Sequence, residues 1–288
     1  MSFFEIPADE IRDLQLTGLR MLLYFDEFCR SHRLTYYMCG GCCIGAVRSG
    51  GFIPWDDDVD VFMPRRDYER LKELWQDTDQ YAIEIPGPDL WTANQFLTIH
   101  DNHTTFIKTY QKDLDINHGV TLDVLPLDGC PEGFRRKAQK FWALLYSLFI
   151  VGKAPTNHGR VQEMAGKLLL ALVPGQKARW RVWHFCERQM TRYPIARCKK
   201  ITELCSGPRY MQLEYPKEAF LHTLRLPFEG HRLPVPAGYD TYLSMAFGNY
   251  MELPPEEERI CHHEYEFMDL KTPYRAYRGI RYARKERK

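Results

Sequence analysis

The chain has 288 residues, in which 39 Lys and Arg balance 38 Asp and Glu, so no strong field points to a nucleic-acid partner. This length can bury a sizeable core, as one large domain or two modest ones. Nine cysteines without a regular framework, and an N-terminus without the features of a signal peptide, predict a cytoplasmic protein rather than a secreted one.

Helices and strands are expected to alternate over the first 130 residues. Residues 8–32 carry the apolar stripe of an amphipathic helix, and the β-prone segment 34–40 ends at Gly40-Gly41, where the backbone can turn sharply. The remaining elements expected here are a short helix or turn at 44–49, a strand at 57–63, a helix at 65–77, and strands within 81–87, 96–101, 104–111 and 119–129.

The middle of the chain reads as helical, with helices expected at 134–149, 161–173 and 177–190, and the last third as ordered loops around one helix. The apolar window 141–152 is too short to span a bilayer, which needs about 20 residues, and is expected to be a buried helix. The pattern predicts an α+β (mixed α/β) fold, with a mixed sheet flanked by helices and a helical subdomain.

An acidic cluster interrupts this pattern at GFIPWDDDVDVFM, residues 51–63. Side chains alternate along a strand, so Asp58 and Asp60 share one face while Val59, Val61 and Met63 take the core face. Mutual repulsion makes such a cluster costly unless it is solvated or holds a cation. Neighbouring carboxylates suit Mg²⁺, which prefers oxygen ligands and shares its shell with substrate phosphates.

Three further features point to phosphoryl chemistry. Asp123 is a lone acid inside an apolar run, which is costly unless the carboxylate is paired or bound to a metal. Gly40 and Gly41 allow backbone N–H groups to approach a phosphate at a helix start, and Arg48 is a suitable bidentate phosphate partner. Asp128 is expected to cap the turn after the strand.

Taken together, these motifs resemble a known family. GGCCIGAVRSGGFIPWDDDVDVFMPRRDY, LDVLPLDG and FEGHRLPVPAGYDTYLSMAFGNYMELPPEEERICHH are similar to motifs of the LicD family, over roughly residues 12–129 and 212–263. The resemblance implies a core of the nucleotidyltransferase fold in residues 1–130, a helical insertion on the acceptor side in 131–210, and a C-terminal LicD-like segment in 211–288 that packs on the core.

The resemblance also implies an activity. Family members are taken to move phosphocholine, or a related alcohol phosphate such as ribitol phosphate, from a CDP-alcohol such as CDP-choline to a sugar of teichoic acid, lipopolysaccharide or capsule, with release of CMP. Asp58, Asp60 and Asp123 would then be catalytic and hold Mg²⁺ (or Mn²⁺), while Gly40, Gly41 and Arg48 would face the diphosphate of the donor. Whether Asp123 acts as a base or as a metal ligand stays open.

This chain departs from the family pattern at two positions. Cys42 stands where the family has Thr after the glycine pair, which removes a hydroxyl that could contact phosphate, and His100 stands at the family's basic position before Asp101. Neither change touches the carboxylates. They bear on the contacts to the donor and not on the phosphoryl-transfer chemistry.

Two other classes of function remain alternatives. One is a nucleotidyltransferase that moves an NMP from an NTP to a small molecule or protein, and the other is a non-catalytic scaffold of a glycan-modifying complex. A Ca²⁺ sensor would need an EF-hand loop, which the sequence lacks. A lipid-linked glycan acceptor leaves open a peripheral contact with the inner face of the membrane, and no nucleic-acid partner is expected.

Some residues carry only weak signals. A quaternary ammonium such as choline is often held over the faces of aromatic rings. The aromatic residues in the matching segments that could form such a site are Trp55, Tyr239, Tyr242 and Tyr250. Aromatic residues of this kind more often belong to the hydrophobic core. Glu229 and Asp240 are expected to be structural. The C-x-x-C spacing of Cys39 and Cys42 has no second pair to complete a zinc site, and the roles of His262 and His263 stay open.

Overall fold

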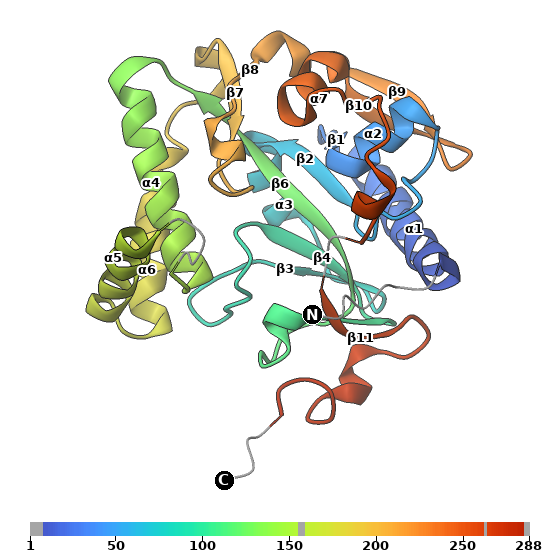
Figure 1. Ribbon diagram of the computed structural model, residues 1–288, viewed down its shortest axis with the longest axis horizontal. Helices are drawn as coiled ribbons and strands as arrows, with labels where there is room; N and C mark the ends of the chain where they lie inside the picture. Colours follow the sequence, from blue (N-terminus) through green and yellow to red (C-terminus); the bar gives the residue numbers. More distant parts are fainter. Residues whose placement is uncertain (1–7, 155–158, 262–263, 285–288) are drawn as a thin grey trace. The chain divides into compact units, whose positions relative to one another are not determined.

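A mixed sheet combined with helices confirms the expected α+β class in the computed structural model of the chain (Figure 1). The structure describes residues 8–154, 159–261 and 264–284. These residues form two compact units. The first comprises the chain up to Glu84, Thr98–Val124 and the chain from Glu218, and the second comprises Ile85–Leu97 and Leu125–Lys217.

The first unit is built on a sheet whose neighbouring strands follow the order β1-β2-β6-β4-β3. Two antiparallel pairs, β9 with β10 and β5 with β11, complete it. Its elements are α1 (Ala8–His32), β1 (Tyr37–Met38), α2 (Gly40–Arg48), β2 (Asp60–Pro64), α3 (Arg65–Leu74), β3 (Tyr81–Glu84), β4 (Leu97–Asp101), β5 (Thr105–Lys108), the start of β6 (Val120–Cys130), β9 (Thr223–Phe228), β10 (His231–Pro236), α7 (Tyr239–Phe247) and β11 (Tyr265–Asp269).

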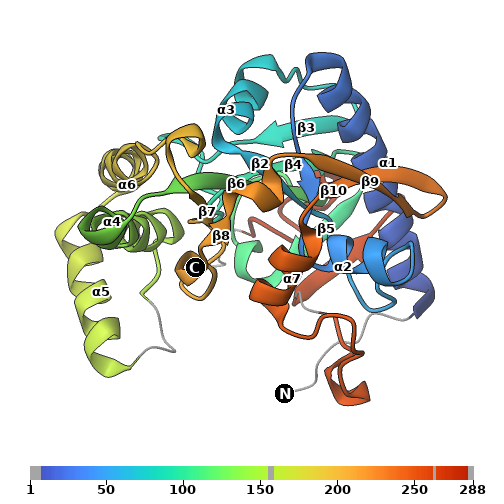
Figure 2. The ribbon, with the colours of Figure 1, turned by 90° about the horizontal axis from the view of Figure 1, so that it is seen from above.

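Helix α1 packs its predicted apolar stripe inward, with Leu22 and Phe25 fully buried. Gly18 lets this helix approach the sheet closely, because a Cβ at Gly18 would lie 2.6 Å from Cγ2 of Val59. Val59 is buried like the strand residues that follow it, so the core face predicted for β2 is confirmed. Helix α2 packs against two later elements of the same unit, α7 and β9 (Figures 1 and 2).

The second unit is a helical layer beside a small antiparallel group of strands. Its elements are the rest of β6, α4 (Gly133–Val151), α5 (Arg160–Leu172), α6 (Gln176–Met190), β7 (Lys200–Glu203) and β8 (Tyr215–Pro216). Helices α4 and α6 pack along one another around a core that includes Ala143, Trp183 and Met190, and α5 lies outside them against α4 (Figure 2). Among the described residues, no helix combines the length and hydropathy that crossing a bilayer requires.

Several sequence predictions need correction. Helix α2 begins at Gly40 itself and not at residue 44, and β2 begins only at Asp60, so Asp58 lies in the loop before the strand. Asp128 is not a turn cap, because β6 continues to Cys130 and Asp128 is buried opposite Thr202 of β7. The β7–β10 strands were not expected: β7 and β8 are only four and two residues long, and β8, β9 and β10 each contain Pro, which cannot donate a ladder hydrogen bond. The three-part division at residues 130 and 210 stays a prediction.

In the second unit, Glu214 allows a pH-dependent prediction. Arg136 Nε and Lys200 Nζ each donate to its carboxylate at 3.0 Å. Burial opposes ionisation, but the hydrogen bonds from Lys200 and Arg136 outweigh it and lower the pKa of Glu214. Its stabilising contribution is therefore present above the unfolded-state pKa of about 4.3 and is lost as the pH falls through the folded-state value.

Glu214→Gln is expected to lower the free energy of unfolding at neutral pH by about 1 kcal/mol, and to have little effect in acid. Urea unfolding at neutral and acidic pH measures this difference. Glu132→Gln is the matched control, since the Glu132–Lys199 pair is exposed at 3.7 Å and should contribute little. Equal losses for both variants, or a loss at Glu214 that does not change with pH, would contradict the assignment.

Candidate active site

The predicted acidic residues meet where the loop before β2 runs beside β6. The backbone N–H of Asp123 donates to the carbonyl oxygen of Val59 at 2.9 Å, which places Asp123 beside the loop and strand that carry Asp58 and Asp60. Burial, followed by the charges of Asp58 and Asp123, raises the pKa of Asp60 well above its usual range. The three carboxylates predicted from sequence therefore lie close enough to repel one another.

Asp56, two residues before Asp58 in the acidic run, also belongs to this cluster. It is buried, and its Oδ2 has no hydrogen-bond partner among the described residues. Burial raises the pKa of Asp56, and the negative charges of Asp58 and Asp57 raise it further. A Cβ at Gly41 would lie 2.0 Å from Asp56 Oδ2, so the carboxylate occupies the space that the glycine leaves.

The glycine pair forms the first turn of α2. Gly40 has a φ of 51°, a conformation that glycine adopts readily, and its N–H donates to Tyr242 Oη at 3.0 Å. A Cβ at Gly40 would lie 4.0 Å from Asp60 Oδ2, so the carboxylates of Asp56 and Asp60 both adjoin this turn. Since the start of a helix carries partial positive charge, the turn offsets part of the cluster's negative charge.

Lys108, at the end of β5, supplies a positive charge that the sequence analysis missed. Its ammonium lies 3.6 Å from Asp123 Oδ2, and the residue is only 4% exposed. Burial alone would lower the pKa of Lys108. The electrostatic attraction of Asp123 outweighs this effect, with smaller contributions from Tyr110, Asp58 and Asp60, so the pKa is raised overall. Lys108 is thus a buried cation facing the acidic cluster. In the sequence it is only a lysine at the end of a short β-prone segment, TFIK.

Arg48 lies at the opposite end of α2 from the glycines. It donates to the carbonyl oxygen of Tyr250 at 3.4 Å, and burial, followed by Arg259, lowers its pKa, while Asp56 acts in the opposite direction. Arg259 in turn lies 5.7 Å from the centre of the Trp55 ring. Two guanidinium groups and an aromatic ring therefore gather near Asp56, an arrangement suited to an anionic group.

Most of the weaker candidates make structural contacts. Tyr242 is buried and packs on Phe62 and Phe220, and Tyr250 donates to Asp240 Oδ1 at 2.8 Å. Glu229 accepts from Arg12, with 2.6 Å between Oε2 and Nη2. One face of the Trp55 ring already carries Arg259.

His100 is buried, with 2.8 Å between its Nε2 and Thr98 Oγ1, and thus belongs to the interior. Cys39 and Cys42 are buried and not in disulfides. His262 and His263 lie outside the described residues.

The carboxylate oxygens of the acidic cluster are ligands that suit a hard cation such as Mg²⁺. Among the described residues, no three His, Cys, Asp or Glu side chains are already arranged as a metal cage. Asp56 Oδ2 and Asp123 Oδ1 are nevertheless buried without hydrogen bonds, and the single ammonium of Lys108 faces several carboxylates. Mg²⁺ is usually bound by one or two carboxylates together with substrate phosphates, so Asp58 and Asp60 fit it without a complete protein cage.

The contact between Gly41 and Asp56 predicts an unusual helix substitution. Ala normally stabilises a helix interior by about 1 kcal/mol relative to Gly. Here the added methyl collides with the Asp56 carboxylate, so we expect Gly41→Ala to lower the free energy of unfolding by about 1–3 kcal/mol.

In an Asp56→Ala background the same substitution should cost at least about 1 kcal/mol less, as measured by urea unfolding of all four proteins. Additive effects of the two substitutions would show that the contact is not made.

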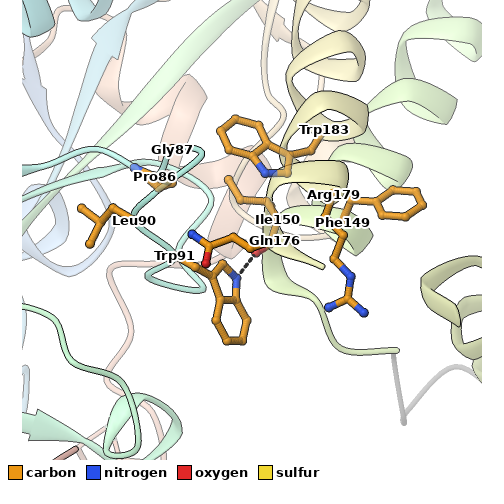
Figure 3. Close-up of a pocket in the computed structure, with 9 residues that line it drawn as sticks. All are labelled: Pro86, Gly87, Leu90, Trp91, Phe149, Ile150, Gln176, Arg179 and Trp183. Carbon is orange, nitrogen blue, oxygen red and sulfur yellow. Dashed lines mark hydrogen bonds between the residues drawn. The ribbon is translucent and has the colours of Figure 1, made fainter. Parts of the chain in front are cut away.

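A separate small cavity lies within the second unit (Figure 3). Trp91 and Trp183 line it together with Arg179, and Trp91 Nε1 donates to the carbonyl oxygen of Ile150 at 2.6 Å. Its volume of about 70 Å³ is far below the roughly 300 Å³ or more of ligand pockets. The cavity therefore reflects how the 85–97 segment is anchored on α4 and α6.

Comparison with known proteins gives three findings. Residues 33–128 match the family model described as LicD/FKTN/FKRP, nucleotidyltransferase domain. The lipopolysaccharide cholinephosphotransferase LicD of Haemophilus influenzae is 29% identical over 269 residues, which cover 88% of this chain and 96% of that protein. An uncharacterized protein of Rickettsia prowazekii is 20% identical over 118 residues, 37% of this chain and 44% of that protein. The matched family range contains the whole acidic cluster and Lys108.

Proposed function

The chain belongs to the LicD family, and from this premise we propose that it is a metal-dependent phosphotransferase. It moves phosphocholine, or a related alcohol phosphate, from a CDP-alcohol to a sugar hydroxyl of a cell-surface glycan, and releases CMP. The observation that carries the proposal is the set of carboxylates Asp58, Asp60 and Asp123, brought together beside the buried cation Lys108.

Transfer of a phosphorylated alcohol is supported by the Haemophilus influenzae relative, whose match spans most of the chain. That protein is named as a cholinephosphotransferase acting on lipopolysaccharide, and 29% identity extends over 88% of this chain, well beyond the matched domain. Lipopolysaccharide is therefore the acceptor class we favour over teichoic acid and capsule. The site suits the chemistry of a diphosphate donor, since a cation between carboxylates and phosphates is the usual arrangement for phosphoryl transfer.

Each residue at the site has a distinct role in the proposed reaction. Asp58 and Asp60 hold Mg²⁺ (or Mn²⁺), which when bound polarises phosphate oxygens and neutralises charge on the leaving group. Lys108 and the first turn of α2 at Gly40 and Gly41 favour the negative charge that develops on the transferred group.

The acceptor hydroxyl oxygen forms the new P–O bond, and the bond from the same phosphorus to the CMP oxygen breaks. Asp123 accepts the hydroxyl proton if it lies within hydrogen-bond reach, and is otherwise a third ligand. Arg48 and Arg259 offer charge for the CMP portion of the donor.

The first test is calorimetric titration of CDP-choline, CDP-ribitol and CTP, each with and without Mg²⁺. We expect Mg²⁺-dependent binding of one CDP-alcohol at least about tenfold tighter than CTP, and loss of CMP release when EDTA removes the metal. Asp60→Asn serves as the control that abolishes the metal dependence. Preference for CTP or another NTP would favour transfer of a nucleotide instead, and absence of binding to every nucleotide would favour the scaffold alternative.

A further inference from the structure

Helix α5 presents a continuous apolar stripe to solvent. Val161, Met164, Leu168 and Leu172 are 82%, 70%, 62% and 69% exposed. Their spacing of three and four residues places them on one face, since a helix turns by about 100° per residue. The packed residues of α5 are Gly166 and Leu170, and Leu170 follows Leu168 by two positions, on the opposite face. The helix therefore has two apolar faces, of which the core uses one.

The same part of the chain is strongly basic. Residues 131–200 contain fifteen Lys and Arg against three Glu and no Asp, although the whole chain is nearly neutral. On α5 itself, Arg160 and Lys167 are exposed, and its one acid, Glu163, pairs with Lys167 at 2.6 Å. Apolar side chains on a helix with basic flanks are typical of a helix that lies in the interface of an anionic membrane.

From these two observations we propose that α5 docks this protein onto an anionic lipid bilayer, with the Val161–Leu172 stripe among the acyl chains and the flanking Lys and Arg near lipid phosphates. A second copy of the chain is the less favoured occupant, because it would bring the same excess of positive charge against itself. An anionic surface complements both the charge and the apolar stripe, and the helix lies on the bilayer without crossing it.

Co-sedimentation with vesicles tests this surface without any turnover, so its result is independent of the proposed reaction. The purified protein is expected to bind phosphatidylcholine vesicles that contain phosphatidylglycerol, and to bind pure phosphatidylcholine vesicles at least about tenfold more weakly. Raised salt should weaken the binding. Arg160→Gln and Lys167→Gln should each reduce it by about fivefold, which is the contribution of one basic residue near an anionic surface.

The double variant Met164→Glu/Leu168→Glu should reduce vesicle binding by at least about tenfold, because it places charge where apolar side chains insert. Both positions are exposed, so the fold should persist, which circular dichroism checks. Leu253→Glu, at a leucine of the first unit that is 56% exposed, is the matched control and should bind like wild type.

Three results would each overturn the proposal: equal binding to the two kinds of vesicle, wild-type binding by the double variant, or an equal loss in Leu253→Glu. A lipid-free dimer that the double variant dissociates, measured by sedimentation velocity, would instead assign the stripe to a second copy.

Discussion

Replacing Asp60 by Asn is expected to reduce turnover by roughly a thousandfold while the protein stays folded. The substitution keeps the shape of the side chain and removes the charge that is assigned to the metal. Because Asp58 and Asp123 act on Asp60 as like charges, removing one of them relieves repulsion. The free energy of unfolding without Mg²⁺ should therefore be equal to or higher than that of wild type, and Asp58→Asn should behave in the same way.

Asp26 provides a control with the opposite signature. It is also a buried carboxylate of the first unit, but it is fully engaged: Tyr36 donates to it at 2.9 Å and Arg225 Nη2 at 2.7 Å. Asp26→Asn should lower the free energy of unfolding by about 2–3 kcal/mol and leave kcat nearly unchanged. Measuring CMP release and urea unfolding for both variants separates a site carboxylate from a structural one. Wild-type turnover in Asp60→Asn would remove the metal assignment.

Much of the first unit was predictable because its signals are local. The stripe of α1, the alternation of acidic and apolar residues before and within β2, and the apolar run of β6 each indicate an element, although the structure buries both faces of β2 and of β6. The β9–β10 hairpin was missed because its register depends on cross-strand pairs such as Leu226 with Leu233, which composition does not reveal. The extra residues of β6 beyond Leu127 depend in the same way on pairing with β7.

The candidate site shows the same limit. The D-x-D motif indicates Asp58 and Asp60 as site residues, and the position of Asp123 as an acid within an apolar run indicates Asp123. Both features are unusual within their own segment of sequence. Lys108 is an ordinary strand-ending lysine in sequence, and only the fold places its ammonium against Asp123. Asp56 likewise needed the structure, since its burial depends on the space left by Gly41. Sequence thus identified residues that break a local pattern, and missed those defined by a distant neighbour.

Replacing Lys108 by Met is expected to have the second largest effect, and the effect has two parts. The Lys108 ammonium forms an ion pair with the buried carboxylate of Asp123. Replacing Lys108 by Met removes this pair and leaves the Asp123 carboxylate buried without it. Breaking such a pair typically costs about 3–5 kcal/mol of unfolding free energy. If Lys108 also stabilises the transferred phosphate, kcat/KM for the donor should fall by a further factor of about 100.

Two companion variants separate the parts. Lys108→Met/Asp123→Leu removes both charges, so the free energy of unfolding should recover largely towards wild type while turnover stays lost, because a neutral pair needs no partner. Lys108→Arg keeps the charge and should retain most of the stability, but only part of the activity, since a planar guanidinium does not reproduce a compact ammonium.

Turnover measured over a range of donor concentrations, at a temperature where each variant is folded, isolates the catalytic part. A kcat/KM close to wild type in Lys108→Met would limit Lys108 to holding Asp123 in place. The charge that offsets the transferred phosphate would then have to come from the first turn of α2 and the bound metal alone.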